Sequence, residues 1–301
     1  MSRLKSHIYS SKVSSAYEKF VPKEFINYLD KESILDVEIG NQVLKEMTVM
    51  FSDIRAFTSL SEKMTPQENF NFINAYLKRM EPNIKNNKGF IDKYIGDAIM
   101  ALFPENPEDA VNAGIFMLQE LEKYNERRIE KGYEPIEIGI GIHTGKLMLG
   151  TVGGENRMDG TVISDNVNLA SRIEGLNKFY GTGILVSSDT MDGIKNKNMF
   201  KFRFIDKVRV KGKKEPIEIF EVLNTKKEKE LKKITENLNL YENAIKFYQK
   251  KEILKALEIF KKIYNIDSGD RIIDVYINRC EKLLKEKINE EWDGVENLYE
   301  K

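Results

Sequence analysis

The chain has 301 residues, of which 41% are hydrophobic and 32% charged, a composition typical of one sizeable globular domain with an accessory segment. Lysine plus arginine equals aspartate plus glutamate at 48 each, so no overall field would attract nucleic acid, and no nucleic-acid partner is expected. The single cysteine, Cys280, excludes an internal disulfide and fits a reducing compartment. The sequence carries no apolar run long enough to span a membrane and no signal-peptide core, so we expect a cytoplasmic location, alone or as the cytosolic part of a membrane-associated system.

Three regions separate by pattern along the chain. Residues 1–43 are polar except for an amphipathic stretch at 20–29, where Pro22 suits the first turn of a helix. Residues 44–224 mix strand and helix periodicities and are expected to form the main domain. Residues 225–301 are charged and helical, and their apolar spacing is equally compatible with one tetratricopeptide repeat and with a plain helical hairpin. The spacing is carried by Leu240, Ala244, Phe247, Ala256, Phe260 and Ile263.

The main region predicts a defined order of elements. In chain order these are a strand at 47–51, a helix at 69–84, strands at 89–95 and 98–103, a helix at 107–129, a strand at 136–143, its hairpin partner at 146–151, a helix at 166–180, a strand at 183–187 and two strands within 200–222. The first helix is expected to bury Phe70, Ile73, Leu77 and Met80. This order indicates an α+β fold with a ferredoxin-like βαββαβ core and a C-terminal all-α helical extension.

Two aspartates stand at informative places in this order. Asp53 follows the first apolar strand, and Asp97 lies in the turn between the second and third strands. Each alone is equally compatible with a local role, Asp53 as a helix cap and Asp97 as a turn residue. In the expected topology, however, both reach one edge of the sheet, where two carboxylates in contact favour a cation between them. Such a pair suits Mg²⁺ bound together with the phosphates of a nucleotide.

Four segments resemble the signature of class III adenylate and guanylate cyclases. They are Phe51-Ser52-Asp53-Ile54-Arg55-Ala56-Phe57-Thr58, Asp92-Lys93-Tyr94-Ile95-Gly96-Asp97-Ala98-Ile99-Met100, Gly141-Ile142-His143-Thr144-Gly145 and Val167-Asn168-Leu169-Ala170-Ser171-Arg172. The resemblance covers residues 44–223 and keeps the order and spacing of the family's motifs. It implies the class III cyclase fold and the conversion of ATP to 3′,5′-cyclic AMP and pyrophosphate with two Mg²⁺ or Mn²⁺ ions about 4 Å apart.

The resemblance also implies roles for single residues. Asp53, Asp97 and the backbone carbonyl of Ile54 match the metal ligands, and the turn with Phe57 and Thr58 matches the loop whose backbone N–H groups bind the triphosphate. Of the remaining matches, Asn168 positions the ribose, Arg172 stabilises charge on the transferring phosphorus, and Lys211 binds the triphosphate. Each has a simpler alternative: Asn168 and Arg172 as one polar helix face, and Lys211 as a solvated turn residue.

Lys93 and Thr161 match the two positions that contact the purine. A lysine can only donate a hydrogen bond, which suits the acceptor N1 of adenine, whereas a threonine hydroxyl can accept from the 6-amino group. Guanine reverses both edges, and the guanylate enzymes have an acidic residue at the position of Lys93. Lys93 therefore favours ATP over GTP, and Thr161 discriminates less because its hydroxyl can also donate.

In the family, each site forms between two protomers packed head to tail, so a homodimer is expected, and this chain carries both halves of a site. The stretch at 20–29 resembles the linker behind sensor modules, which implies an upstream sensor or a separate regulatory partner. Two alternatives stay open, a guanylate cyclase and a catalytically inactive module that dimerises or binds nucleotide. Because residues 225–301 contribute no matched residue, a chain that ends near Asn224 is expected to cyclise ATP.

Overall fold

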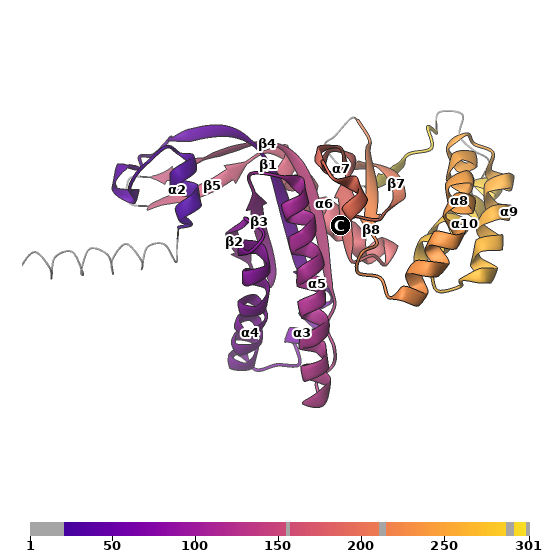
Figure 1. The fold of residues 1–301 in the computed structure, drawn as a ribbon, viewed down its shortest axis with the longest axis horizontal. Helices are drawn as coiled ribbons and strands as arrows, with labels where there is room; N and C mark the ends of the chain where they lie inside the picture. The colour runs from indigo at the N-terminus through magenta and orange to yellow at the C-terminus, as the bar shows by residue number, and fades with distance from the viewer. Residues whose placement is uncertain (1–20, 155–156, 211–214, 287–291, 299–301) are drawn as a thin grey trace, which may run out of the picture.

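A computed structural model describes residues 21–154, 157–210, 215–286 and 292–298. The helix expected near the N-terminus is present as α2, Lys23–Tyr28, followed by the short 3-10 turn η1, Ile34–Asp36. Phe25 of α2 is buried, and its ring lies where a side chain at Gly160 would otherwise project. The packing of Phe25 therefore holds α2 against one end of the sheet (Figure 1). This end, called the arm below, consists of the paired residues 42–46, 146–154 and 157–163.

The ferredoxin-like core is confirmed by the strand order β2-β3-β1-β4. Its elements are β1 (Gln42–Ile54), α3 (Phe57–Ser61), α4 (Pro66–Lys85), β2 (Phe90–Ile95), β3 (Ala98–Phe103), α5 (Pro107–Glu130) and β4 (Ile138–Gly154). Helices α4 and α5 lie side by side along one face of the sheet and share its largest hydrophobic cluster (Figure 1). This connectivity places the end of β1 beside the turn between β2 and β3.

Helix α4 buries only part of the stripe expected: Met80 is buried and Ile73 and Leu77 pack partly buried against the core, but Phe70 does not. Phe70 is 69% exposed, whereas Phe72, Tyr76, Met80 and Ile84 are buried. These four residues are spaced by four along the helix, so they form one continuous row toward the sheet. Thr65 and Glu68 form a capping box that starts the helix, and Phe70 falls outside the buried row.

The expected hairpin across Thr144 and Gly145 is wrong, because β4 runs without interruption through both residues. β4 pairs with β1 over its length, from Ile54 opposite Ile138 to Gln42 opposite Gly150. A Cβ at Gly145 would lie 2.5 Å from the Asn166 amide, so this glycine permits a close approach. The partner that follows β4 is β5, Arg157–Ile163, which pairs with the distal half of β4.

The sheet continues on the other side of β4. The elements that follow are α6 (Asp165–Tyr180), β6 (Ile184–Ser187), α7 (Ser188–Gly193), η2 (Lys197–Met199), β7 (Phe202–Val210) and β8 (Ile217–Val222). Their strands extend the order as β4-β6-β8-β7. Helix α6 packs closely on β4 and also contacts β1, so it connects the two parts of the sheet.

In the described part of the C-terminal region, three helices share a core with the sheet (Figure 1). They are α8 (Glu228–Gln249), α9 (Ile253–Ile266) and α10 (Arg271–Glu286). Tyr276 of α10 packs in one buried cluster with Tyr180 of α6 and Ile219 of β8. Leu240, part of the expected apolar pattern, is 40% exposed. A short strand that the sequence did not predict, β9 (Glu296–Leu298), pairs in parallel with β7.

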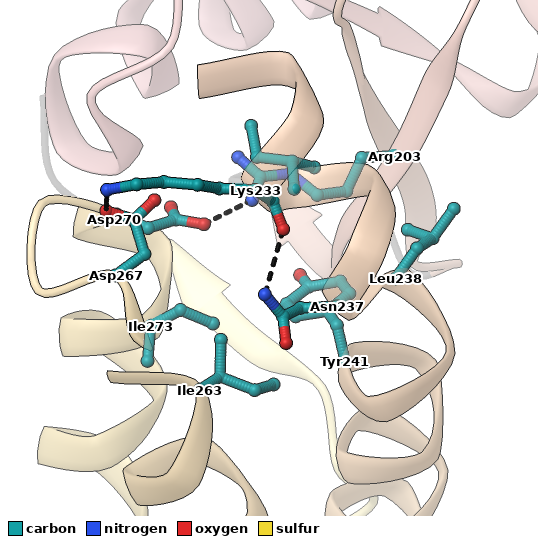
Figure 2. A pocket seen from close by; sticks show the side chains of 10 residues that line it. Arg203, Lys233, Asn237, Leu238, Tyr241, Ile263, Asp267, Asp270 and Ile273 are labelled. Carbon is teal, nitrogen blue, oxygen red and sulfur yellow. Dashed lines mark hydrogen bonds and ion pairs between the residues drawn. The ribbon is translucent and has the colours of Figure 1, made fainter. Parts of the chain in front are cut away.

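Buried charges also join the helices to the sheet. Arg203 of β7 is 3% exposed and pairs with Glu221 at 2.6 Å. It also pairs with Asp270, which precedes α10 (Figure 2). Next to this group, Lys233 pairs with Asp267 at 2.8 Å. The cavity among these side chains measures about 10 Å³, room for one water molecule at most, so it is no substrate site. Among the described residues, no helix combines the length and apolar character that a membrane crossing requires.

Candidate active site

Asp53 and Asp97 meet at the end of β1. Ser52 of β1 lies opposite Ile99 of β3, which brings the β2–β3 turn with Asp97 alongside Asp53. The backbone N–H of Ile54 donates to both carboxylates, to Asp53 Oδ1 at 3.1 Å and to Asp97 Oδ2 at 3.3 Å. The shared donor shows that the two carboxylates are neighbours, as the sequence predicted.

The electrostatics of this pair are unfavourable without a cation. Burial, followed by the interaction with Asp53, raises the pKa of Asp97 to about 7. Glu174 of α6 lies nearby, and burial together with the Asp53 charge raises its pKa to about 8. A divalent cation would relieve this repulsion, so the donors fit one. Among the described residues, no group of three or more acidic, histidine or cysteine side chains is placed to hold a metal ion.

A left-handed turn at Ala56 follows the first aspartate. Ala56 has a φ of 54°, a left-handed conformation that reverses the chain before α3. Arg55 ties this turn to the rest of the fold through Glu137 at 2.9 Å and through the carbonyl oxygen of Thr182. Phe57 stacks on Phe72 with ring centroids 6.2 Å apart.

The expected phosphate-binding amides belong to this turn. Phe57 and Thr58 form the first turn of α3, where backbone N–H groups have no acceptor within a helix. Their contact with a triphosphate stays a prediction, as does metal ligation by the Ile54 carbonyl. Lys211, the other expected triphosphate ligand, lies outside the described residues.

The structure brings Lys93 and Thr161 together from distant parts of the chain. Lys93 lies on β2 and Thr161 on β5, and the ammonium Nζ donates to Thr161 Oγ1 at 3.3 Å. Lys93 also lies 3.3 Å from the carboxylate of Asp92. Among the described residues, a hydrogen bond joins Lys93 to Thr161, and none joins either residue to Asp53 or Asp97. The Lys93–Thr161 pair and the Asp53–Asp97 pair are therefore two hydrogen-bonded clusters of expected site residues.

Asn168 and Arg172 lie on a third element, helix α6. Both are exposed and stand four residues apart, so they share one face of the helix. Ser164 caps the helix by accepting from the Asn166 N–H at 3.1 Å, and Asn166 is bound by buried His143 at 3.1 Å. These contacts fix the N-terminal end of α6 against β4.

The direction of this face is informative. Each residue advances about 100° around an α-helix, so Arg172 lies about 200° from Glu174. Besides burial, the charges of Asp53 and Asp97 raise the pKa of Glu174, which places its carboxyl near the aspartate pair of its own chain. Arg172 therefore leaves α6 on the side opposite to Glu174.

Sequence reasoning missed three residues near the site. Arg55 lies inside a matched motif and Glu174 lies two residues beyond one, but nothing in their spacing indicated which neighbours they contact. Asp92 directly precedes Lys93, and on a regular strand its side chain would point to the opposite face. Asp92 contacts Lys93 because β2 is irregular between Ile91 and Lys93, and this irregularity is visible only in the strand register.

Comparisons with known proteins identify the same region. A family model described as the adenylate and guanylate cyclase catalytic domain matches residues 39–224. An adenylate cyclase of Anabaena cylindrica is 47% identical over 217 residues, which cover 70% of this chain and 43% of that protein. The terminal-differentiation specific adenylate cyclase of Dictyostelium discoideum is 38% identical over 279 residues, 91% of this chain and 13% of that protein. The chain thus spans less than half of either relative, and the second match extends into the C-terminal helices.

The chain is also similar to solved structures of adenylyl and guanylyl cyclases. The adenylyl cyclase CyaB of P. aeruginosa has a TM-score of 0.56 at 34% identity and covers 62% of this chain and 97% of that chain. The guanylyl cyclase Cya2 has a TM-score of 0.52, also at 34% identity, over 60% of this chain and 92% of that chain. A bacterial light-regulated adenylyl cyclase has a TM-score of 0.63 at 27% identity, over 78% of this chain and 66% of that chain. Adenylyl and guanylyl enzymes resemble the chain about equally, so similarity to solved structures does not determine the base.

Proposed function

The chain belongs to the family of adenylate and guanylate cyclase catalytic domains, and on this premise we propose that it converts ATP to 3′,5′-cyclic AMP and pyrophosphate. The ribose 3′-oxygen forms a bond to the α-phosphorus while the bond from that phosphorus to the leaving pyrophosphate breaks. Such phosphoryl transfer depends mainly on positioning and on charge stabilisation. Each cluster of the site supplies one part of this requirement.

Asp53 and Asp97, with the Ile54 carbonyl, would hold two Mg²⁺ or Mn²⁺ ions. When bound, such ions neutralise phosphate charge and acidify the 3′-hydroxyl. The first-turn amides of α3 bind phosphate oxygens, since free N–H groups at a helix start favour anions. Asn168 orients the ribose, and Arg172 stabilises charge at the α-phosphorus.

The contact between Lys93 and Thr161 carries the choice of ATP. At 3.3 Å the lysine donates to the threonine hydroxyl, whose remaining lone pair can accept from the 6-amino group of adenine. Another ammonium proton of Lys93 can donate to adenine N1, whereas guanine carries a proton there. An unpaired buried polar group costs about 1–3 kcal/mol, which corresponds to roughly a 5- to 150-fold preference for ATP.

Steady-state kinetics with ATP and with GTP test this choice. Lys93→Glu is expected to lower kcat/KM for ATP far more than Thr161→Ala, because the hydroxyl of Thr161 can rotate to serve either base. A wild-type enzyme that prefers GTP, or turns over both nucleotides equally, would contradict the adenylate assignment and favour the guanylate alternative. A folded protein that turns over neither would favour an inactive module.

A homodimer would complete the site. Arg172 leaves α6 on the side opposite to Glu174, the residue near the aspartate pair of its own chain, which supports a site completed by Arg172 of a second protomer. The arm also offers an apolar surface: Leu44 and Ile163 are 56% and 60% exposed and flank Met148 in a cross-strand row. Such an exposed row favours contact between copies. Head-to-tail pairing would unite Asp53 and Asp97 of one protomer with Lys93, Asn168 and Arg172 of the other.

Complementation tests the shared site. Asp97→Ala and Arg172→Ala homodimers are each expected to lose nearly all activity, since each lacks one group at both sites. A mixed dimer keeps one intact site, so mixing the two proteins is expected to restore activity. Subunit exchange is followed by energy transfer between labelled copies, and exchange without recovery would exclude shared sites. An upstream sensor or regulatory partner stays a proposal.

A further inference from the structure

Strand β2 contains a bulge beside the base-contacting lysine. Ile91 pairs with Ala101, and Lys93 pairs with the next residue, Met100, so Asp92 is the extra residue of the bulge. In a regular strand, consecutive side chains point to opposite faces. A bulge re-aims a side chain, and here the Asp92 Oδ2 lies only 3.3 Å from Nζ of the adjacent Lys93.

Asp92 is buried although it is charged. Its side chain is 3% exposed, against 39% for Lys93, and its Oδ2 accepts no hydrogen bond from a described residue. Burial raises the pKa of Asp92, and the ammonium of Lys93 opposes this shift. A buried carboxylate needs a nearby cation, and Lys93 is the one that the described residues place against it.

The Lys93 ammonium thus has a carboxylate on one side and a hydroxyl group on another, which leaves a third N–H available to a ligand. Asp92 and Thr161 each lie 3.3 Å from Nζ, on two different strands. We propose that Asp92 is a positioning residue that, together with Thr161, directs the remaining donor of Lys93 toward N1 of adenine. A free lysine side chain carries about 2 kcal/mol of rotamer entropy, and the ion pair with Asp92 together with the hydrogen bond to Thr161 removes part of it before the nucleotide arrives.

This inference rests on the proposed function and specifies which atom of the base is recognised. Lys93, as positioned by Asp92, recognises a purine whose ring nitrogen at position 1 carries no proton. The effect of Asp92 should therefore depend on N1 itself and vanish for a base that lacks it. A purely structural role would lower activity with every nucleotide alike.

The test compares ATP with 1-deaza-ATP, in which a C–H group replaces N1. Asp92→Asn is expected to lower kcat/KM for ATP at least tenfold, about 1.4 kcal/mol, chiefly through KM. With 1-deaza-ATP, the same substitution is expected to change kcat/KM less than twofold. Equal losses with the two nucleotides, or no loss with ATP, would overturn the proposal.

Three further variants distinguish a positioning role of Asp92 from a general effect on the fold. In a Lys93→Met background, Asp92→Asn should cause no further loss, because the group that it positions is gone. Asp192→Asn, at an aspartate whose side chain is 74% exposed on α7, is the matched control and should leave both nucleotides unaffected. If Asp92→Asn folds poorly in thermal melts, Asp92→Ser replaces it with the same expectation.

A wild-type protein that does not turn over ATP would refute the proposed function without ending this test. Calorimetric affinities measured with Ca²⁺ then replace the kinetic constants. Weaker ATP binding by Asp92→Asn with unchanged 1-deaza-ATP binding would still support the positioning role. Equal weakening of both, or of neither, would overturn it.

Discussion

Asp97→Asn is expected to abolish catalysis and at the same time to stabilise the metal-free fold. The pKa of Asp97 rises from 3.8 to about 7, chiefly through burial and then through the neighbouring Asp53. At about 1.4 kcal/mol per pKa unit, the charged form costs at most about 4 kcal/mol. Because Asp97 is partly exposed, solvent screening reduces this to about 1–3 kcal/mol. An asparagine keeps an acceptor for the Ile54 N–H and removes the charge.

The sign of the pH dependence follows from the raised pKa. Near pH 4 the carboxyl is protonated in the folded protein, and the penalty is nearly absent. As the pH rises toward 7, the unfolded chain ionises before the folded one, so wild-type stability falls. The gain of Asp97→Asn should therefore appear at pH 8 and nearly vanish near pH 4.

Thermal melts in EDTA at both pH values measure this effect. At about 2–4 °C per kcal/mol, the Tm of Asp97→Asn should exceed that of wild type by about 2–12 °C at pH 8. Mn²⁺ should raise the wild-type Tm by binding the folded state, and should raise that of the variant much less. Activity within tenfold of wild type, or a metal-free Tm at pH 8 at or below wild type, would refute the paired-carboxylate argument.

Three further predictions concern the framework around the site. Gly141→Ala should destabilise the fold by about 1–3 kcal/mol and reduce activity, because its Cβ would lie 2.2 Å from the Glu174 backbone nitrogen; Gly175→Ala, with nothing within 4 Å, is the control in urea unfolding. Arg203→Met should cost about 3–5 kcal/mol by leaving buried Glu221 without this partner, and a urea midpoint equal to wild type would contradict this. A chain ending at Asn224 should aggregate, contrary to the expectation from sequence, because it exposes the core shared with the C-terminal helices; a monodisperse, active truncation on size-exclusion chromatography would refute this.

The sequence determined the order of elements in the βαββαβ core and the neighbouring positions of Asp53 and Asp97. An apolar strand that ends at Asp53 and a Gly96-Asp97 turn are local patterns, and the βαββαβ order then leaves one way to join them. The hydrogen-bonding chemistry of Lys93 and Thr161 was also predictable from side-chain type. Their contact at 3.3 Å confirms that the two positions form one cluster.

Only the tertiary structure decided how strands continue and which way side chains point. The sequence around Gly145 suggested a turn, yet β4 continues there because the missing Cβ makes room for Asn166. The bulge at Asp92 and the position of Glu174 near the aspartate pair likewise depend on pairing and packing across the sheet. The spacing of apolar residues indicates which face of a helix or strand is buried. It holds no information about which distant segment of the chain covers that face. For that reason, the shared core of the helices α8–α10 and the sheet emerged only from the fold.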